Sequence, residues 1–384
     1  MEPRLNQFNF IPYELPPEAE TLRHEVRAFL TETLANKPAV ERAQSWSGGS
    51  REFSRKLGAR GWIGMTWPKK YGGHELSYAE RYVVIEELLV AGAPVGSHWV
   101  ADRQSGPLLL RFGTEEQRQT LLPKIARGEL CFCIGMSEPG AGSDLASVRT
   151  RARCVDGGWK VSGQKIWTSN AQHADWMIAL VRTGDAEQRH AGLSQLLVDM
   201  KSPGLTVKPI ANLTGESHFN EVFFDDVFVP DAMLIGAEGD GWRQVGAELA
   251  YERSGPERYL SSIRVLLEFL RVVGDKPSEA ERILIGEMTA RMWTLRQMSL
   301  SIAGKLAAGE NPAVAAALVK DLGTSFEQDL PRAVQALAPA RNFSDDDPFQ
   351  RTLSYLLQTS PSFSLRGGTR EILRGIIARE LGLR

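Results

Sequence analysis

The sequence is poor in cysteine. Its 384 residues include three, Cys131, Cys133 and Cys154. Three thiols are too few for the disulfide framework of a small secreted protein. A Cys-x-Cys pair with no histidine beside it is also a poor zinc site. We therefore expect buried thiols in a reducing compartment, and no metal centre.

Long apolar runs are absent as well. The first ten residues, MEPRLNQFNF, lack the apolar stretch of a signal peptide, and no later run is long enough to span a bilayer. The net charge of −2 gives no electrostatic reason to expect nucleic acid or an anionic membrane as a partner. These absences predict a cytoplasmic globular protein without a membrane span.

A Rossmann fingerprint is also missing, since no GxGxxG follows an expected strand. What the sequence does contain is a change of hydrophobic period. Apolar residues recur at helical spacing up to about residue 130, and short β-branched or aromatic runs separated by Gly, Asp and Pro follow. Helical spacing returns after residue 236. In NEVFFDDVFVP, the pair Asp225-Asp226 interrupts the strand alternation and indicates a β-bulge.

This order of helices, strands and helices predicts an α+β protein and not one of alternating βαβ units. The domains that we expect are an N-terminal α-helical domain over residues 1–127, a middle antiparallel β domain over 128–235 and a C-terminal α-helical bundle over 236–384. Local signals add detail. Ser278 with Glu281 three residues later predicts a helix N-cap, whereas Pro123 and Gly255-Pro256 predict helix breaks.

The most unusual stretch is GMSEPGAGSD, residues 135–144. A loop rich in glycine leaves backbone N–H groups free and closely approachable, which suits the pyrophosphate of a dinucleotide. The hydroxyls of Ser137 and Ser143 would be additional donors. A tight turn between strands is the alternative interpretation, and the loop by itself does not decide between them.

Two further clusters carry polar groups beside special backbone. In GQKIWTSN, Trp167, Thr168 and Ser169 follow an expected strand, where an indole and two hydroxyls would line a flat conjugated ring or simply complete a core. Near the C-terminus, Gly367-Gly368 breaks the chain and Thr369 is placed as the N-cap of the helix EILRGIIAREL. A helix N-terminus is suited to an anion or a carbonyl oxygen.

Taken together, MSEPGAGSDLAS, GQKIWTSN, FDDVFVP and GGTREILRGIIAREL resemble the acyl-CoA dehydrogenase family over nearly the whole chain. The resemblance implies two α domains flanking a β domain, and FAD as cofactor. It also implies the reaction: a carboxylate removes the α-proton of an acyl-CoA while the flavin takes a hydride from the β-carbon. An electron-transfer flavoprotein is the oxidant that the resemblance suggests.

The resemblance also assigns residues to the site. Those expected to hold the cofactor are Met136, Ser137, Gly142, Ser143, Trp167, Thr168, Ser169, Thr369 and Glu371. Those expected to meet the substrate are Ser143, Leu249, Arg253, Gly367 and Gly368.

The base departs from the commonest family pattern. Many members carry a Glu immediately before a Gly-Thr pair near the C-terminus, and here that position is Gly367. A second group carries the Glu on the first helix of the C-terminal domain, before an Arg and shortly after a G-x-G-[WF] turn. In this chain Gly-Asp-Gly-Trp leads to Glu252 and Arg253, so Glu252 is the expected base. Pairing of Glu252 with Arg253 or Arg258, or simple solvation, is the alternative. Weaker candidates are Glu248 and Glu257.

The adenine end of the cofactor is a second departure. The family's R-x-x-F-G and Q-x-x-G-G-x-G stretches, which reach a neighbouring subunit's cofactor, are not found. The chain therefore forms either a homo-oligomer that holds adenosine differently or a hetero-oligomer with a homologous subunit. Two alternatives to a dehydrogenase stay open: a non-catalytic or half-site partner subunit, and a flavin oxidase or monooxygenase on the same fold.

Overall fold

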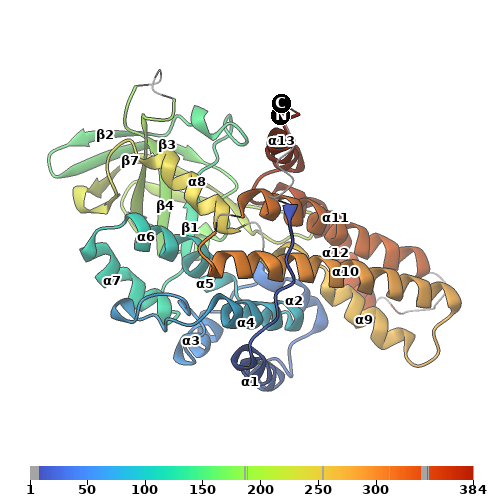
Figure 1. Cartoon of the computed structure of the whole chain (residues 1–384). Coiled ribbons are helices and arrows are strands. Elements are labelled where there is room, and N and C mark those ends of the chain that lie inside the picture. Colours follow the sequence, from blue (N-terminus) through green and yellow to red (C-terminus); the bar gives the residue numbers. More distant parts are fainter. Residues whose placement is uncertain are drawn as a thin grey trace. The chain divides into compact units, whose positions relative to one another are not determined.

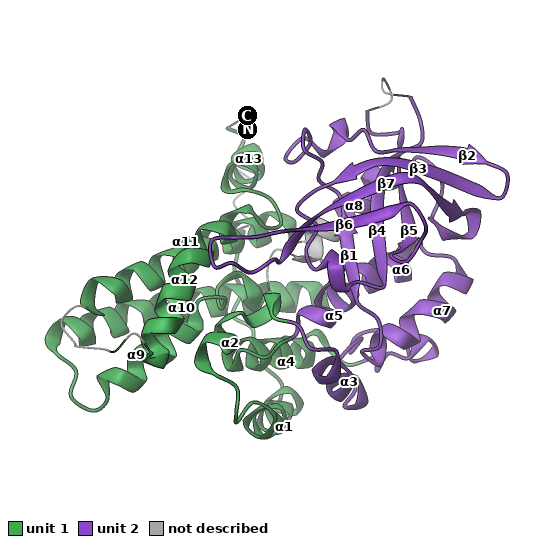
Figure 2. Ribbon diagram, turned by 180° about the vertical axis from the view of Figure 1, so that it is seen from behind, with its two compact units in different colours: residues 1–48, 76–94, 252–384 green, residues 49–75, 95–251 purple. Residues whose placement is uncertain are grey.

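The computed structural model describes residues 8–185, 187, 189–252, 255–310, 312–338, 344 and 346–383, and for residues 248–252 it describes the backbone alone. The chain forms two compact units, shown in different colours in Figure 2. Unit 1 consists of residues 1–48, 76–94 and 252–384, and unit 2 consists of residues 49–75 and 95–251. The domain boundaries expected near residues 127 and 235 stay predictions.

Unit 2 contains a sheet of eight strands in the part of the chain that is described, coloured green to yellow in Figure 1. The strand order is β6-β7-β3-β2-β4-β5-β8, and β1 pairs with β4 outside this path. β1 runs parallel to β4, β2 meets β4 in parallel at one residue pair, and the other neighbours are antiparallel. The strands are β1 Phe132–Gly135, β2 Arg151–Val155, β3 Gly158–Lys165, β4 Trp176–Arg182, β5 Leu193–Asp199, β6 Leu205–Ile210, β7 Phe219–Pro230 and β8 Leu234–Ile235. The expected α+β class is confirmed.

The bulge predicted in β7 is present. The register between β3 and β7 shifts between Val161 and Gly163, and the extra residue falls on β7 at Asp225-Asp226. Asp226 has φ +49°, a left-handed conformation that aspartate tolerates better than most residues. Its Oδ1 accepts a hydrogen bond from Ser162 Oγ at 2.6 Å. The extra residue is therefore held by a side-chain contact to the opposite strand.

The helices of unit 2 are α3 Arg51–Ala59, α5 Gly96–Val100, α6 Gly106–Phe112, α7 Glu115–Ala126 and α8 Gly241–Glu252. The break expected at Pro123 does not occur, because α7 continues through it to Ala126. Pro123 lies in the last turn of α7. Because proline has no backbone N–H, the helix loses only one hydrogen bond there. The break expected at Gly255-Pro256 is confirmed: α8 ends at Glu252, and a short 3-10 turn, η8 Pro256–Arg258, begins after Gly255.

Between α5 and α6 the chain forms a π-helical turn, η4 Ala101–Ser105. Asp102 on this turn accepts a hydrogen bond from the backbone N–H of Gly64 at 2.8 Å. The preceding His98 is buried, and its Nδ1 lies 2.8 Å from Ser54 Oγ. Single π-turns inside helices occur frequently at functional sites.

Unit 1 is helical. Its helices are α1 Pro17–Thr33, α2 Ala39–Ala43, α4 Tyr78–Ala91, α9 Ile263–Val273, α10 Glu279–Ala307, α11 Ala313–Leu337, α12 Pro348–Thr359 and α13 Arg370–Glu380. α11 packs against α9, α10, α12 and α13 and is the central helix of this unit. Another 3-10 turn, η10 Ser360–Leu365, joins α12 to the segment before α13.

Side-chain caps fix the ends of several helices. Ser278 and Glu281 form the predicted capping box of α10: Glu281 N donates to Ser278 Oγ at 3.3 Å, and Ser278 N donates to Glu281 Oε2 at 2.7 Å. Thr369 is the N-cap of α13, as predicted, with its Oγ1 accepting from Ile372 N. Such reciprocal caps satisfy N–H groups that have no partner inside the helix.

Candidate functional site

The glycine-rich loop after β1 forms a tight turn. Glu138 and Ala141 exchange two backbone hydrogen bonds, Glu138 N to Ala141 O at 2.9 Å and Ala141 N to Glu138 O at 3.0 Å. Within the described ranges, no acceptor takes the N–H groups of Gly140, Gly142 or Ser143. A Cβ at either glycine would meet nothing within 4 Å, so both face open space. The turn interpretation and the anion interpretation are therefore compatible, because this turn leaves three N–H groups exposed.

A buried ion pair holds the base of this loop. Lys165, at the end of β3, is fully buried, and its Nζ lies 2.8 Å from Glu138 Oε1 and donates to Met136 O at 3.1 Å. Glu138 also accepts from the backbone N–H groups of Arg149 at 2.6 Å and Thr150 at 2.9 Å. The loop is thus fixed at Met136 and Glu138 by groups that water does not reach.

Burial and pairing act on both pKa values of this pair. Burial lowers the pKa of Lys165 to about 8, although Glu138 opposes the shift. Burial would raise the pKa of Glu138, but Lys165 and the hydrogen bonds to the carboxylate leave it below its usual value. Both groups therefore carry their charges at neutral pH. Sequence reasoning did not identify Lys165, and the only signal was a lysine within the apolar strand end GQKIW.

The segment after β3 lies beside this loop. Ile166 N donates to Ser137 O at 2.9 Å, which joins the two stretches that the sequence pointed to. Trp167 has φ +59° and is 56% exposed, an unusual combination for a large aromatic residue. Thr168 is buried, and its Oγ1 has no hydrogen-bond partner among the residues that the structure describes. Ser169 is half-buried.

These features suit the flavin cofactor that the resemblance implies. The exposed indole of Trp167 offers a flat face for stacking. The Thr168 hydroxyl lacks an acceptor or donor within the described residues, and such a buried group is costly unless a ligand completes it. The exposed N–H groups of Gly140, Gly142 and Ser143 suit a pyrophosphate. A left-handed, non-glycine residue such as Trp167 is also a common mark of a ligand site.

The second group of predicted residues lies in unit 1, at the turn before α13. Gly367 has φ +63° and Gly368 has φ +99°, and the second value is one that only glycine adopts readily. The fully buried Lys320 of α11 donates a hydrogen bond to Gly368 O at 2.6 Å. Glu371, in the first turn of α13, is exposed; hydrogen bonds from its own backbone and from Thr369 lower the pKa of its carboxyl.

Glu252 is the last residue of α8, and its side chain lies outside what the structure describes, as do those of Leu249 and Glu248. Arg253 lies outside the described residues altogether. The alternative candidate Glu257 is buried on η8, with Arg258 beside it at 4.0 Å. A Cβ at Gly255 would meet the Glu257 carboxylate, which would have to move aside. The role of Glu252 stays a prediction.

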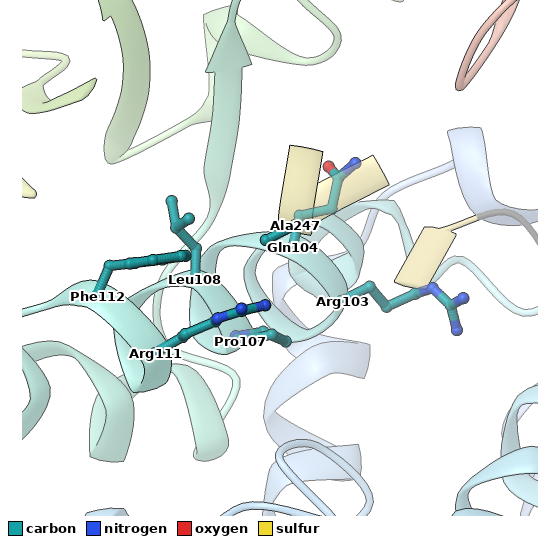
Figure 3. Close-up of a pocket in the computed structure, with 7 residues that line it drawn as sticks. All are labelled: Arg103, Gln104, Pro107, Leu108, Arg111, Phe112 and Ala247. Carbon is teal, nitrogen blue, oxygen red and sulfur yellow. The ribbon is translucent and has the colours of Figure 1, made fainter. Parts of the chain in front are cut away.

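A hollow of about 260 Å³, part of it open to solvent, lies beside the π-turn (Figure 3). In Figure 3 the guanidinium of Arg103 points away from Leu108 and Phe112. Ala247 of α8 is part of the wall, so the hollow borders the helix that ends at Glu252. The lining residues, which the sequence did not single out, are Arg103, Gln104, Pro107, Leu108, Arg111, Phe112 and Ala247.

The described residues contain neither a candidate membrane span nor a candidate metal-binding cluster. No helix among them is both long enough and apolar enough to cross a membrane. In the same ranges, no three His, Cys, Asp or Glu side chains converge as they would around a metal ion.

Models of the acyl-CoA dehydrogenase family match three consecutive parts of the chain. The N-terminal domain model matches residues 16–129, the middle domain model residues 133–227 and the C-terminal domain model residues 239–382. Together they account for most of the sequence.

Curated proteins and solved structures agree with these matches. The acyl-CoA dehydrogenase IpdE1 of Mycobacterium tuberculosis is 36% identical over 384 residues, which cover 95% of this chain and 98% of that protein. A structure described as the Tcur3481-Tcur3483 steroid ACAD is 29% identical with a TM-score of 0.86, covering 97% of this chain and 99% of that one. The ChsE4-ChsE5 complex from Mycobacterium tuberculosis is 30% identical with a TM-score of 0.83, covering 97% and 100%. The chain belongs to the acyl-CoA dehydrogenase family and is an FAD-dependent enzyme of that class.

Proposed function

We propose that this enzyme desaturates an acyl-CoA thioester between its α and β carbons, with Glu252 as the base that removes the α-proton. The observation that carries the proposal is the turn before α13, where Gly367 and Gly368 provide no carboxylate at the position of the commoner base. Glu252 stands at the end of α8, after Gly-Asp-Gly-Trp, which matches the second subgroup of the family.

The chemistry is divided among residues of the chain as follows. Glu252 takes the α-proton, which the thioester carbonyl acidifies. Bound FAD supplies the acceptor for the β-hydride. Trp167 would offer a stacking face to the flavin ring system, and the Thr168 hydroxyl would be a hydrogen-bonding group for the cofactor. Ser169 lies beside them at the same strand end.

The remaining predicted residues are assigned to the pyrophosphate of FAD and to the acyl-CoA substrate. The exposed N–H groups and hydroxyls of the loop after β1 would hold the pyrophosphate of bound FAD. The resemblance also assigns cofactor contacts to Thr369 and Glu371, at the start of α13. It assigns substrate contacts to Ser143, Leu249, Arg253, Gly367 and Gly368, and these assignments stay predictions.

For the acyl group, we propose a bulky, ring-containing substrate. Two consecutive glycines at the proposed substrate wall leave more room than a Glu-Gly pair would. The similarity to a structure described as a steroid ACAD, at 29% identity over 97% of this chain, supports the same class. An electron-transfer flavoprotein is the proposed oxidant, in keeping with the family.

A second candidate is a half-site subunit of a hetero-oligomer. It is favoured by the missing adenine motifs and by two similar structures whose descriptions name pairs of proteins, Tcur3481-Tcur3483 and ChsE4-ChsE5. In that case the chain expressed alone would retain flavin poorly. Native mass spectrometry of the purified chain, with its flavin content per subunit, separates the two candidates: full occupancy in a homo-oligomer contradicts the second.

The base assignment is tested by anaerobic titration of the flavin-loaded enzyme with a panel of straight-chain, branched and steroid-derived acyl-CoAs. Wild type should lose its oxidised-flavin absorption, and Glu252→Gln should lose it at least about 1,000-fold more slowly, because the proton has no acceptor. Glu248→Gln removes the weaker candidate one turn earlier on α8 and should bleach at the wild-type rate if Glu252 is the base. Equal bleaching rates in wild type and Glu252→Gln would show that another group is the base. Turnover with oxygen against an artificial one-electron acceptor distinguishes an oxidase.

A further inference from the structure

Three charged side chains of α11 hold the segment that contains Gly367 and Gly368. Lys320 donates to Gly368 O at 2.6 Å. Asp321, next to it, accepts from Arg370 Nε at 2.9 Å and from Arg374 Nε at 3.2 Å on α13. Two turns further along α11, Glu327 faces the residue on the other side of the glycine pair.

That residue, Arg366, is fixed by several contacts. Its guanidinium lies over the rings of Trp46 at 4.2 Å and Phe363 at 4.1 Å. Its Nη2 donates to Ser261 Oγ at 3.3 Å and lies 3.5 Å from Glu327 Oε2. Glu327 also accepts from Ser261 N at 2.7 Å. The peptide group before Gly367 is therefore attached to a side chain that has little freedom.

This arrangement is not explained by stability alone. A fully buried lysine loses its hydration, and replacing a whole buried ion pair with apolar residues of similar size is often neutral or stabilising. The glycine pair, in contrast, gains conformational freedom from lacking a Cβ and needs outside contacts to keep one geometry. The buried charges supply those contacts on both sides of the pair, at Arg366 and at Gly368 O.

We infer that Lys320 and Arg366 are positioning residues for the dehydrogenation, which fix the peptide groups around Gly367 and Gly368 where this turn meets the acyl thioester. The inference rests on the proposed function, because that proposal places the turn beside the substrate. Lys320 has a second effect: an ammonium on the Gly368 carbonyl polarises the same peptide group and makes the N–H of Thr369 a stronger donor.

The test uses the flavin-loaded enzyme and the variant Lys320→Met. Amide hydrogen exchange in deuterium oxide is followed at Ile372 and Leu373, whose N–H groups bond to Thr369 Oγ1 and Thr369 O and so report opening of this turn. We expect exchange there to be faster by about 10- to 100-fold, with α10 unchanged, since one charge-assisted hydrogen bond is lost.

Steady-state kinetics on the acyl-CoA that bleaches wild type fastest provide the second measurement. Lys320→Met should lower kcat by about 10- to 100-fold and change KM by less than about 3-fold, because misplacement of a reacting geometry acts on the chemical step. Lys320→Arg should recover part of the rate. The control is Arg296→Met, which removes a cation of unit 1 that pairs with Glu86 on α4. It should lower the unfolding temperature but leave kcat within about 2-fold.

If Lys320→Met does not fold, Arg366→Lys gives the same test, since it keeps the charge but loses the guanidinium that spans Ser261, Glu327 and the two rings. Exchange and kcat both within about 2-fold of wild type in the folded variant would overturn the inference. The two proposals fail separately. If Glu252→Gln abolishes bleaching but Lys320→Met has no effect, only the positioning role of Lys320 and Arg366 is refuted. If Lys320→Met lowers kcat but Glu252→Gln bleaches like wild type, only the assignment of Glu252 as the base is refuted.

Discussion

The pair Lys165–Glu138 allows a quantitative prediction for the variant Glu138→Gln. The change keeps the size of the side chain and one carbonyl oxygen for the backbone N–H groups of Arg149 or Thr150. It removes the charge that lies 2.8 Å from Lys165 Nζ. Lys165 then stays fully buried, with Met136 O as the neutral acceptor that the structure gives it.

The size of the effect follows from the proton on Lys165. In the folded variant, a neutral Lys165 has a lower free energy than a buried, unpaired ammonium. Neutralising a lysine of ordinary pKa 10.5 at pH 7 costs about 5 kcal/mol, at about 1.4 kcal/mol for each pH unit. This sets an upper limit, and removing one partner of a buried pair usually costs about 3–5 kcal/mol. We therefore expect the free energy of unfolding to fall by about 3–5 kcal/mol at pH 7.

The pH dependence gives a sharper test. In Glu138→Gln the folded state holds Lys165 neutral while the unfolded state keeps its proton below pH 10.5, so the unfolded state binds more protons and stability rises with pH. The expected slope is about 1.4 kcal/mol per pH unit between about pH 6 and 7.5. Wild type should lack it there, because its Lys165 stays charged below a pKa of about 8.

Urea unfolding followed by circular dichroism at several pH values measures both quantities. The double variant Glu138→Gln/Lys165→Met should recover most of the loss and show no such slope, since no charge is left unpaired. A loss of less than about 1 kcal/mol in the single variant, or the same pH dependence as wild type, would refute this account of the loop.

Two further predictions concern other buried polar groups. Thr168→Val should leave the unfolding free energy of the flavin-free protein within about 1 kcal/mol of wild type, because Oγ1 has no partner in the described part of the chain, yet weaken FAD binding by about 3- to 10-fold, measured by flavin fluorescence. Destabilisation of about 2 kcal/mol or more would contradict it. For His98, burial lowers the pKa to about 4 from 6.5, against the opposing charge of Asp102. Its contribution to stability is therefore present above pH 6.5 and lost, by about 3 kcal/mol, as the pH falls to 4. Acid titration of His98→Gln should show a shallower loss than wild type, and parallel curves would count against it.

The features that the sequence predicted correctly are mostly local. The capping box of Ser278 and Glu281 and the N-cap Thr369 depend on residues three apart, so a short stretch contains the whole signal. The bulge at Asp225-Asp226 likewise shows in the alternation of a single strand. The prediction of a helix break at Pro123 was wrong because the effect of a proline depends on its position within the helix. The residues of α7 do not by themselves show where the helix ends, so this position could not be judged from the sequence.

The features that the sequence did not reveal join distant residues. Lys165 meets Glu138 across 27 positions, and Lys320 meets Gly368 across 48. Each charge, taken along the chain, looks like an ordinary surface residue, since lysine is rarely fully buried. The partner that makes burial possible comes from another element, and tertiary contacts of this kind leave no periodic pattern.

The conformation of Gly367 has a consequence for how this enzyme class diversifies. Its φ of +63° lies in the left-handed region, where a residue with a side chain costs about 1–2 kcal/mol, whereas Gly368 at +99° must remain glycine. The backbone strain of a glutamate at position 367 would therefore be small against an ordinary stability of about 5–15 kcal/mol. If the proposed function holds, this left-handed backbone leaves room for a large acyl group when it carries glycine, and it would carry the other subgroup's base when it carries glutamate. On that proposal, two substitutions, one at each end of the C-terminal region, separate the two ways of placing a carboxylate in this scaffold.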